Sequence, residues 1–323
     1  MTTGSGSPNE PSAPSAASAS APVLAPSDVI RRSELTCPGH SAKMMAHAAA
    51  SAADQVMFDL EDACAVSQKE AARATVAEAL NTLDFGSKTR TFRPNAIASR
   101  FFYRDLITVV EAAGRHLDGV VIPKVDGPAD VQFVDRFLTQ IELQMGYEVG
   151  KIRIEALIES AEAVLHAEQI AIATPRMSGL IFGLVDYAGD IGARELGAEQ
   201  FFYYNYAKAK TIAAARAARI SCVDGVTLAI RDLDACRRDS EMAARMGFDG
   251  KWAIHPSQVP VINAAFTPSA EEIARAQRVL DAYAQADVES GVGAIILDDE
   301  MVDAATLRMM RRTLGIARKA GLA

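Results

Sequence analysis

The chain of 323 residues is poor in aromatic side chains, which make up 6% of it, and it contains a single tryptophan. Half of the residues are hydrophobic, and Ala, Val, Ile and Leu supply much of that apolar content. This balance favours helices packed on buried strands. It argues against an aromatic-rich sandwich and against a surface that stacks the bases of single-stranded nucleic acid.

Three further absences narrow the class of protein. No uninterrupted apolar run approaches the roughly 20 residues that a membrane-spanning helix needs. The 33 basic residues are outnumbered by 41 acidic ones, so the net charge is −8 and the basic surface of a nucleic-acid-binding protein is missing. The four cysteines form no Cys-x-x-Cys pair, which argues against a disulfide framework or a zinc knuckle. We therefore expect a cytoplasmic enzyme with no nucleic-acid or membrane partner.

Residues 1–28 consist almost wholly of Ser, Ala, Pro, Gly and Thr. A segment of this composition cannot bury enough apolar area to offset its ordering entropy, so we predict a disordered tail. It has neither the basic start nor the apolar centre of a secretory signal peptide.

Residues 29–266 alternate between short apolar runs and longer stretches with helical spacing. Val131, Val134, Leu138 and Ile141, for example, recur at intervals that place them on one helix face. Strand–helix alternation repeated eight times predicts a (β/α)8 TIM barrel, with a doubly wound open sheet as the alternative. The eight runs are Arg32–Cys37, Gln55–Leu60, Thr89–Arg93, Gly119–Lys124, Ile152–Ile158, Gly179–Leu184, Arg219–Val223 and Gly250–Ile254.

Residues 267–323 predict a C-terminal helical extension that a closed barrel does not need. Ser269 and Glu272 have the spacing of a capping box, and the helix that they begin should run to about Val288. A glycine-rich connection at 291–293 leads on to a final helix from about Asp303 to Lys319. An appendage of this size covers one end of the barrel or reaches a neighbouring subunit.

Polar residues follow nearly every predicted strand, at the end of the barrel where TIM-barrel active sites lie. Two carboxylates on adjacent strands can hold a hard divalent ion and leave its other positions to water and substrate oxygens. Glu159 and Asp186, after the fifth and sixth strands, are the best-placed pair. The competing interpretation is that these charges are solvated or pair with one another. A whole ring of that kind is costly to bury without a ligand or a metal.

The same strand ends carry recognisable motifs, and through them the chain resembles the citrate lyase β-subunit-like group of the HpcH/HpaI aldolase superfamily. Within that group it is most similar to malyl-CoA lyases. The resemblance extends from Arg31 to the C-terminus. The motifs are Arg32-Ser33-Glu34-Leu35 with Pro38-Gly39, Phe58-Asp59-Leu60-Glu61-Asp62-Ala63, Ile122-Pro123-Lys124-Val125, Leu157-Ile158-Glu159-Ser160, Phe182-Gly183-Leu184-Val185-Asp186 and Gly250-Lys251-Trp252-Ala253-Ile254-His255-Pro256-Ser257-Gln258.

The resemblance implies a Mg²⁺-dependent (or Mn²⁺-dependent) carbon–carbon lyase. Its substrate would be a 3-hydroxyacyl-CoA thioester such as malyl-, methylmalyl-, citramalyl- or citryl-CoA, cleaved to acetyl-CoA or propionyl-CoA and an oxoacid. By position, Glu159 and Asp186 would bind the metal, and Arg93 would bind the substrate and stabilise the enolate. Asp303 would be the catalytic aspartate that completes a neighbouring subunit's site, with Asp298 as the second choice. A homotrimer or hexamer would follow.

Other residues are expected to bind coenzyme A or to support the site. Arg32, Lys43 and His255 are the candidates for the CoA side, and Glu61, Asp62 and Lys124 form a cluster expected to support the metal and substrate groups. Three alternatives stay open: a malyl-CoA thioesterase, a class II aldolase that acts on pyruvate without CoA, and a non-catalytic barrel that binds an acid.

Overall fold

A computed structural model describes Met1 and residues 29–322, apart from residues 195, 197–199 and 291–292. The tail predicted for residues 1–28 lies outside the described residues except for Met1. Part of the glycine-rich connection, residues 291–292, lies outside them as well.

Eight parallel strands form a closed barrel in sequence order. Closure is direct, because Leu35 of the first strand pairs with Ala253 of the last. The predicted (β/α)8 barrel is therefore confirmed, and the open sheet was the wrong alternative. The strands are β1 (Ser33–Pro38), β2 (Gln55–Asp59), β3 (Thr89–Arg93), β4 (Gly119–Ile122), β5 (Arg153–Ile158), β6 (Met177–Phe182), β7 (Ser221–Asp224) and β8 (Gly250–Ala253).

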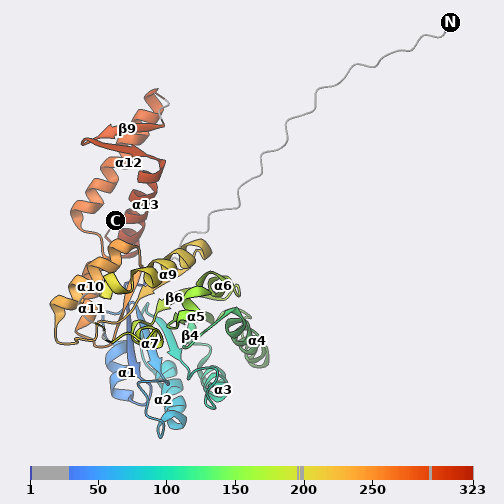
Figure 1. Cartoon of the computed structure of the whole chain (residues 1–323). Helices are drawn as coiled ribbons and strands as arrows, with labels where there is room; N and C mark the ends of the chain where they lie inside the picture. The colour runs from blue at the N-terminus through green and yellow to red at the C-terminus, as the bar shows by residue number, and fades with distance from the viewer. Residues whose placement is uncertain (2–28, 195, 197–199, 291–292, 323) are drawn as a thin grey trace.

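Helices connect successive strands and form the outer ring of the barrel, as Figure 1 shows. None of the helices in the described part of the chain combines the length and apolar character needed to cross a membrane. The helices between successive strands are α1 (Ala42–Ala49), α2 (Lys69–Thr82), α3 (Phe102–Ala113), α4 (Pro128–Met145), α5 (Ala161–Leu165), α6 (Ala167–Ala171), α7 (Leu184–Asp190), α8 (Gln200–Tyr203), α9 (Asn205–Ala218) and α10 (Leu233–Met246), and α11 (Gln258–Phe266) follows the last strand.

Local sequence signals explain where these helices begin and end. The Ser160 hydroxyl accepts a hydrogen bond from the Ala163 amide at 3.0 Å and so caps α5. Helix α4 ends at Gly146, whose φ of 65° suits a residue without a Cβ. The helical faces predicted from apolar spacing are buried, as Val131, Val134 and Leu138 of α4 illustrate.

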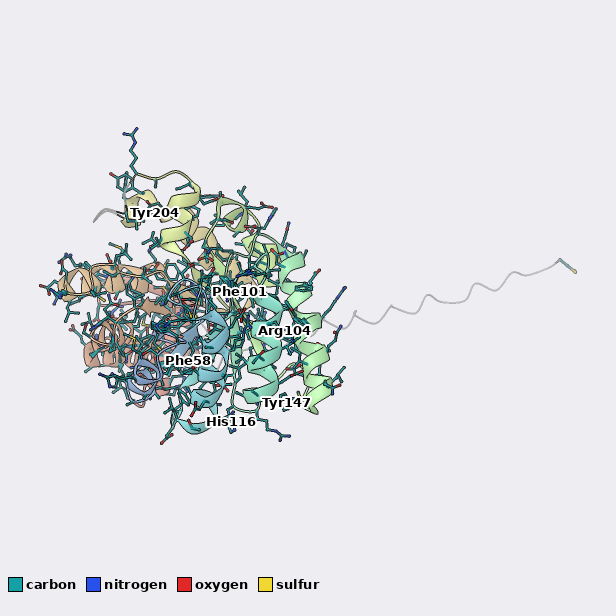
Figure 2. All side chains as sticks on the ribbon, turned by 90° about the horizontal axis from the view of Figure 1, so that it is seen from below. Phe58, Phe101, Arg104, His116, Tyr147 and Tyr204 are labelled. Carbon is teal, nitrogen blue, oxygen red and sulfur yellow. The ribbon has the colours of Figure 1, made fainter. Side chains whose placement is uncertain are left out.

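Side chains of the strands alternate between two cores. Outward-facing residues pack beneath the helices: Phe58 of β2, labelled in Figure 2, lies 5.9 Å from Phe85, centroid to centroid. Inward-facing residues fill the barrel with an apolar middle layer, so the barrel is a packed core and not a pore. The middle layer consists of Met57, Val121, Leu157, Ile181, Val223 and Trp252.

Below the middle layer, at the amino ends of the strands, the interior is polar. Glu155 accepts a hydrogen bond from the Gln55 amide at 2.7 Å and forms an ion pair with Arg31. Glu34 is buried beside them, and neither of its carboxylate oxygens has a hydrogen-bond partner among the described residues. Burial raises the pKa of Glu34 to about 7, although Arg31 and Arg93 act in the opposite direction.

The C-terminal segment forms a separate layer that stands out from the barrel (Figure 1). The predicted capping box is present: the Glu272 amide donates to Ser269 Oγ at 3.1 Å, and the Ser269 amide donates to Glu272 Oε2 at 2.7 Å. A two-stranded hairpin, which the sequence did not predict, joins the two helices; Asp298 and Asp299 turn it with φ of 51° and 63°. The elements are α12 (Ala270–Ser290), β9 (Ala294–Leu297), β10 (Glu300–Asp303) and α13 (Ala304–Lys319).

We predict that Glu34→Gln stabilises the barrel in a pH-dependent way. Because the folded state raises the Glu34 pKa above its unfolded value near 4.5, wild-type stability falls as pH rises from that value to about 7. The amide mimics the protonated acid and carries no such penalty. Urea unfolding should show the variant to be more stable by up to about 3 kcal/mol at pH 8, with the difference vanishing near pH 4.5.

Glu155→Gln is the matched control, because it removes a carboxylate that has partners. It should lower the free energy of unfolding by breaking the ion pair with Arg31. A Glu34→Gln variant that is no more stable than wild type at pH 8 would contradict the expectation.

Candidate active site

Arg93, the last residue of β3, is a buried cation that carboxylates hold at the carboxyl end of the barrel. Its Nε lies 2.8 Å from Asp59 Oδ1 and its Nη2 lies 2.7 Å from Asp59 Oδ2, so the last residue of β2 grips it through two parallel hydrogen bonds. Burial would lower the pKa of Arg93, but Asp59, Glu61 and Glu159 outweigh it and the pKa is raised. Arg93 is therefore a permanent charge.

Asp59 is the carboxylate that pairs with the Arg93 charge. Burial would raise its pKa, but the Arg93 guanidinium and the amides of Glu61 and Ala63, each 2.8 Å away, hold the pKa below its usual range. The same two amides belong to the loop after β2. Asp59 therefore shapes the loop that carries Glu61 and Asp62.

Glu61 joins Arg93 to Lys124. Its Oε1 accepts a hydrogen bond from Lys124 Nζ at 2.8 Å, and its Oε2 lies 3.1 Å from Arg93 Nη1. The geometry of the second contact is that of an ion pair without a hydrogen bond, so Oε2 is a buried oxygen that no donor of the described chain satisfies. Lys124 Nζ also approaches Asp62 at 3.7 Å and Asp186 at 3.9 Å. The expected cluster of Glu61, Asp62 and Lys124 is present.

Glu159 follows β5 directly and is buried at 3% exposure. The Lys124 amide donates to its Oε1 at 2.7 Å, and Lys124 adopts a φ of 51° in doing so. Gly183 packs against the same carboxylate: a Cβ at this position would lie 2.5 Å from Glu159 Oε2. Burial first, and then Asp186, raise the pKa of Glu159 to about 8.

Asp186 lies in the first turn of α7, just after Gly183, and its side chain is 40% exposed. The pair of Glu159 and Asp186 thus offers one buried and one accessible carboxylate. Oxygen donors of this kind suit a hard divalent cation. The described residues contain no group of three or more His, Cys, Asp or Glu side chains that could hold a metal. The donor set fits an ion that takes its remaining ligands from water and substrate.

Two of the three candidates for coenzyme A lie at this end of the barrel. Lys43 is exposed in the first turn of α1, directly after β1, and His255 is exposed just beyond β8. His255 Nδ1 lies 2.7 Å from Ser257 Oγ. Both side chains therefore border the opening at the carboxyl end of the barrel, its mouth, where a ligand would enter.

Arg32 does not belong to this group, and its assignment to the CoA side was wrong. It precedes β1 and therefore lies at the amino end of the barrel, opposite to the mouth. Its Nε and Nη2 each bind one oxygen of Asp54 at 2.9 Å, and its Nη1 donates to Thr267 Oγ1 at 2.9 Å. Arg32 therefore forms a structural ion pair with Asp54.

Asp303 lies on the extension, where it caps α13. Its Oδ1 accepts hydrogen bonds from the Ala305 amide at 2.8 Å and the Thr306 amide at 3.1 Å, and these donors lower its pKa. Asp298, the second choice, lies in the hairpin turn, and Arg278 Nη2 lies 3.3 Å from its Oδ2. The structure of one chain brings neither carboxylate to Arg93.

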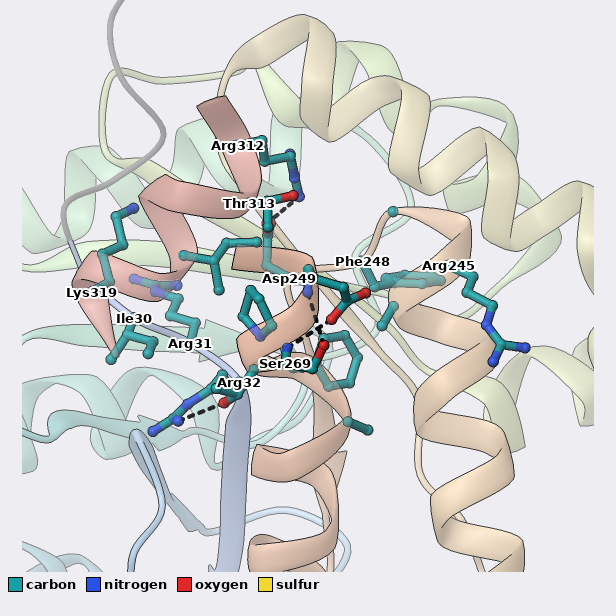
Figure 3. A pocket seen from close by; sticks show the side chains of 18 of the residues that line it. Ile30, Arg31, Arg32, Arg245, Phe248, Asp249, Ser269, Arg312, Thr313 and Lys319 are labelled. Carbon is teal, nitrogen blue, oxygen red and sulfur yellow. Dashed lines mark hydrogen bonds and ion pairs between the residues drawn. The ribbon is translucent and has the colours of Figure 1, made fainter. Parts of the chain in front are cut away.

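The extension joins its own barrel at the amino end, as Figure 3 shows. Arg312 of α13 binds Asp249, just before β8, at 2.9 Å. A cavity of about 720 Å³ separates α13 from the residues that precede β1. The cavity lies at the end of the barrel opposite to Glu159 and Asp186.

Sequence reasoning missed two residues of the site. Asp59 and Trp252 appeared there only as parts of the family motifs. The ring of Trp252 lies under Arg93, with the guanidinium carbon 5.3 Å from the ring centroid. The alternation of residues along β8 indicates from the sequence that Trp252 points into the barrel. The sequence does not indicate that its partner is Arg93, three strands away on β3.

Comparison with known proteins identifies the family of the chain. The family model described as HpcH/HpaI aldolase/citrate lyase matches residues 32–256. The L-malyl-CoA/beta-methylmalyl-CoA lyase of Cereibacter sphaeroides (strain ATCC 17025 / ATH 2.4.3) is 37% identical over 292 residues, covering 86% of this chain and 91% of that protein. The citrate lyase subunit beta of Leuconostoc mesenteroides subsp. cremoris is 33% identical, covering 89% and 93%.

Solved structures give the same result. The structure of the protein CitE from Mycobacterium tuberculosis in complex with magnesium, acetoacetate and coenzyme A superposes with a TM-score of 0.74 at 29% identity, covering 91% of this chain and 99% of that one. A citrate lyase from Burkholderia xenovorans LB400 superposes with a TM-score of 0.82 at 23% identity, over 93% and 96% of the two chains, and supports the fold alone. The predicted family and the expectation of a lyase are confirmed: the chain belongs to the HpcH/HpaI aldolase/citrate lyase family.

Proposed function

We propose that this protein is a Mg²⁺-dependent carbon–carbon lyase that cleaves or forms a 3-hydroxyacyl-CoA thioester. The products of cleavage are acetyl-CoA or propionyl-CoA and an oxoacid. The observation that carries the proposal is the carboxyl end of the barrel, where a fixed Arg93 guanidinium lies among Asp59, Glu61 and Glu159, and Asp186 lies near the buried Glu159. The names of its relatives, malyl-CoA lyase and citrate lyase subunit beta, and the magnesium and coenzyme A in the CitE structure, support the same reaction.

Glu159 and Asp186 are the residues that would hold Mg²⁺. When bound, the ion supplies Lewis-acid polarisation and a template for the oxygens of the oxoacid. Glu159 is kept in place by the Lys124 amide and by its close packing on Gly183. Asp186 faces solvent and leaves access for the substrate.

Arg93 stabilises the negative charge that develops when the carbon–carbon bond breaks. Its guanidinium is charged throughout and already oriented by Asp59, so little reorganisation accompanies the reaction. A planar fork can contact both an enolate oxygen and a carboxylate. Glu61 and Lys124 balance the charge around it.

Asp303 transfers the proton. In cleavage the 3-hydroxyl group releases its proton to water as the carbon–carbon bond breaks and the carbonyl of the oxoacid forms, and the acid form of Asp303 protonates the acetyl-CoA enolate at carbon. In condensation the Asp303 carboxylate removes a proton from the methyl group, and the new alkoxide takes a proton from water. One chain holds Asp303 far from its own mouth, because α13 contacts the barrel at Arg312, nine positions further on and about 14 Å along the helix. Asp303 therefore serves a neighbouring subunit, and the enzyme is a homo-oligomer, a trimer or a hexamer.

The test of this function is a panel of malyl-, methylmalyl-, citramalyl- and citryl-CoA, with Mg²⁺ or with excess EDTA, in which acyl-CoA and oxoacid are both quantified. We expect equal amounts of the two products and no turnover in EDTA. Asp186→Asn should retain the fold by circular dichroism and lower kcat by more than about 10²-fold, because it removes one ligand of the charge-stabilising ion.

Asp234→Asn, an exposed carboxylate on α10 that pairs with Arg237, is the control and should keep wild-type kcat. Release of free CoA without an oxoacid would identify a thioesterase instead. Wild-type activity of Asp186→Asn in excess EDTA would rule out the metal mechanism.

Gly183→Ala tests the position of Glu159 without relying on catalysis. The new methyl group would lie 2.4 Å from Glu159 Cβ and 2.5 Å from its Oε2, and the Gly183 amide is tied to the Ile158 carbonyl at 3.0 Å. Displacing the carboxylate should weaken Mg²⁺ binding by about 10- to 100-fold, the usual effect of disturbing the support of a metal ligand. Calorimetric titration with Mg²⁺ and glyoxylate measures it.

Gly189→Ala is the matched control on the same helix, because no atom lies within 4 Å of the Cβ that it adds. It should leave Mg²⁺ affinity unchanged. Equal affinities for the two variants would show that Glu159 does not bind the ion.

Complementation tests the shared site. Asp303→Asn and Arg93→Ala subunits should each keep only a small residual kcat, and mixed oligomers should rise well above it because some sites join an intact Arg93 to an intact Asp303. Asp303→Asn alone should bind Mg²⁺ and glyoxylate normally but stop exchange of the acetyl-CoA methyl protons with solvent.

Mixing Arg93→Ala with Asp186→Asn subunits is the control. Both changes affect the same barrel mouth, so no interface can rebuild a complete site and the mixture should stay at the residual kcat. Mixtures of the first pair that stay at the residual kcat, or a fully active monomer, would contradict the shared site and point to Asp298 or to a base within the barrel.

A further inference from the structure

Trp252 reaches Arg93 across the inside of the barrel. Trp252 lies on β8 and Arg93 on β3, and β1 and β2 stand between these strands. The guanidinium carbon lies 5.3 Å from the centroid of the indole, within the range of a cation–π contact. Both side chains are buried, so water screens this contact little.

The indole is itself fixed. Its Nε1–H donates a hydrogen bond to Thr36 Oγ1 on β1, and its ring packs in the middle layer with Met57 and Val223. A buried indole that has both its polar hydrogen and its apolar surface satisfied has little freedom to turn. Trp252 is therefore a rigid surface at the base of the mouth.

Asp59 alone does not determine the orientation of Arg93. Its carboxylate holds the edge of the guanidinium formed by Nε and Nη2, while Nη1 points to Glu61. Rotation about the Arg93 side chain could still tilt the plane of the group. The face of the indole opposes that tilt.

We propose that Trp252 is a positioning residue for Arg93. Its indole holds the guanidinium plane so that Nη1 stays directed into the mouth, where the proposed lyase stabilises an enolate. The inference rests on the proposed function for the identity of that reaction. The contact between the two side chains has a readout of its own, because Trp252 is the single tryptophan of the chain.

The kinetic test compares Trp252→Leu with Trp252→Phe. Leucine removes the aromatic face and should lower kcat and kcat/KM together by about 5- to 30-fold, as expected for a buried cation–π contact that aids the transition state. Phenylalanine keeps a face and should stay within about 3-fold of wild type. Val223→Ala, in the same layer, should lower the melting temperature and leave kcat unchanged.

A double-mutant cycle separates positioning from general destabilisation. If Trp252 acts through Arg93, Trp252→Leu should cause no further loss of residual kcat in an Arg93→Ala background. A folded Trp252→Leu variant with wild-type kcat, or an equal loss in both backgrounds, would overturn the proposal.

Fluorescence tests the contact without turnover. Arg93→Ala should shift the emission of Trp252, and glyoxylate with Mg²⁺ should change the emission of the wild type but not of Arg93→Ala. Arg104→Ala, whose guanidinium lies over Tyr103, is the control and should leave the emission unchanged. If no CoA thioester is cleaved but Arg93→Ala shifts the emission, the proposed reaction fails and the contact stands. An unshifted emission overturns the contact itself.

Discussion

The carboxyl end of the barrel depends on how it holds one positive charge, that of Arg93, away from water. A buried guanidinium needs carboxylate partners, because its desolvation is otherwise too costly. Asp59 supplies two hydrogen bonds and in turn takes the amides of Glu61 and Ala63, which fixes the loop after β2. That loop places Glu61 against Lys124, and the Lys124 amide orients Glu159. The contacts form one continuous chain from β2 to β5.

The same network leaves negative charge unbalanced. Arg93 is committed to Asp59 and Glu61, and Lys124 approaches Glu61, Asp62 and Asp186 at once. Glu159 has no ion pair within 4.0 Å in the described part of the chain, and its pKa of about 8 reflects burial and the nearby Asp186. A site that buries a carboxylate under these conditions gains from a bound cation. This imbalance is the electrostatic support for the proposed Mg²⁺ site.

The sequence predicts the barrel well because each strand and helix has a local signal. The eight apolar runs lie at the positions of β1 to β8, and the Ser269–Glu272 capping box begins α12. Glu159 and Asp186 could be paired because parallel strands end on the same side of a barrel. Arg32 was misassigned because its motif outweighed its position in front of β1, which already implies the amino end. The Trp252–Arg93 contact could not be predicted, because it joins residues 159 positions apart through the interior and depends on side-chain orientation.

The charged side chains at the two ends of the barrel differ in whether the same chain supplies all of their partners. This difference concerns the role of the C-terminal extension. At the amino end, Arg31, Arg32 and Arg312 each pair with a carboxylate of the same chain. The pair of Arg312 with Asp249 also fastens α13 to this end. An extension fastened there points away from its own mouth, and Asp303 ends the β9–β10 hairpin of that extension by pairing with Ala294. The mouth, by contrast, contains Arg93 and the carboxylates of Glu159 and Asp186, and among the described residues of the extension neither Asp298 nor Asp303 pairs with Arg93. The arrangement of a single chain is therefore complete as a fold and incomplete as the proposed lyase, and a second copy is the simplest source of the missing carboxylate.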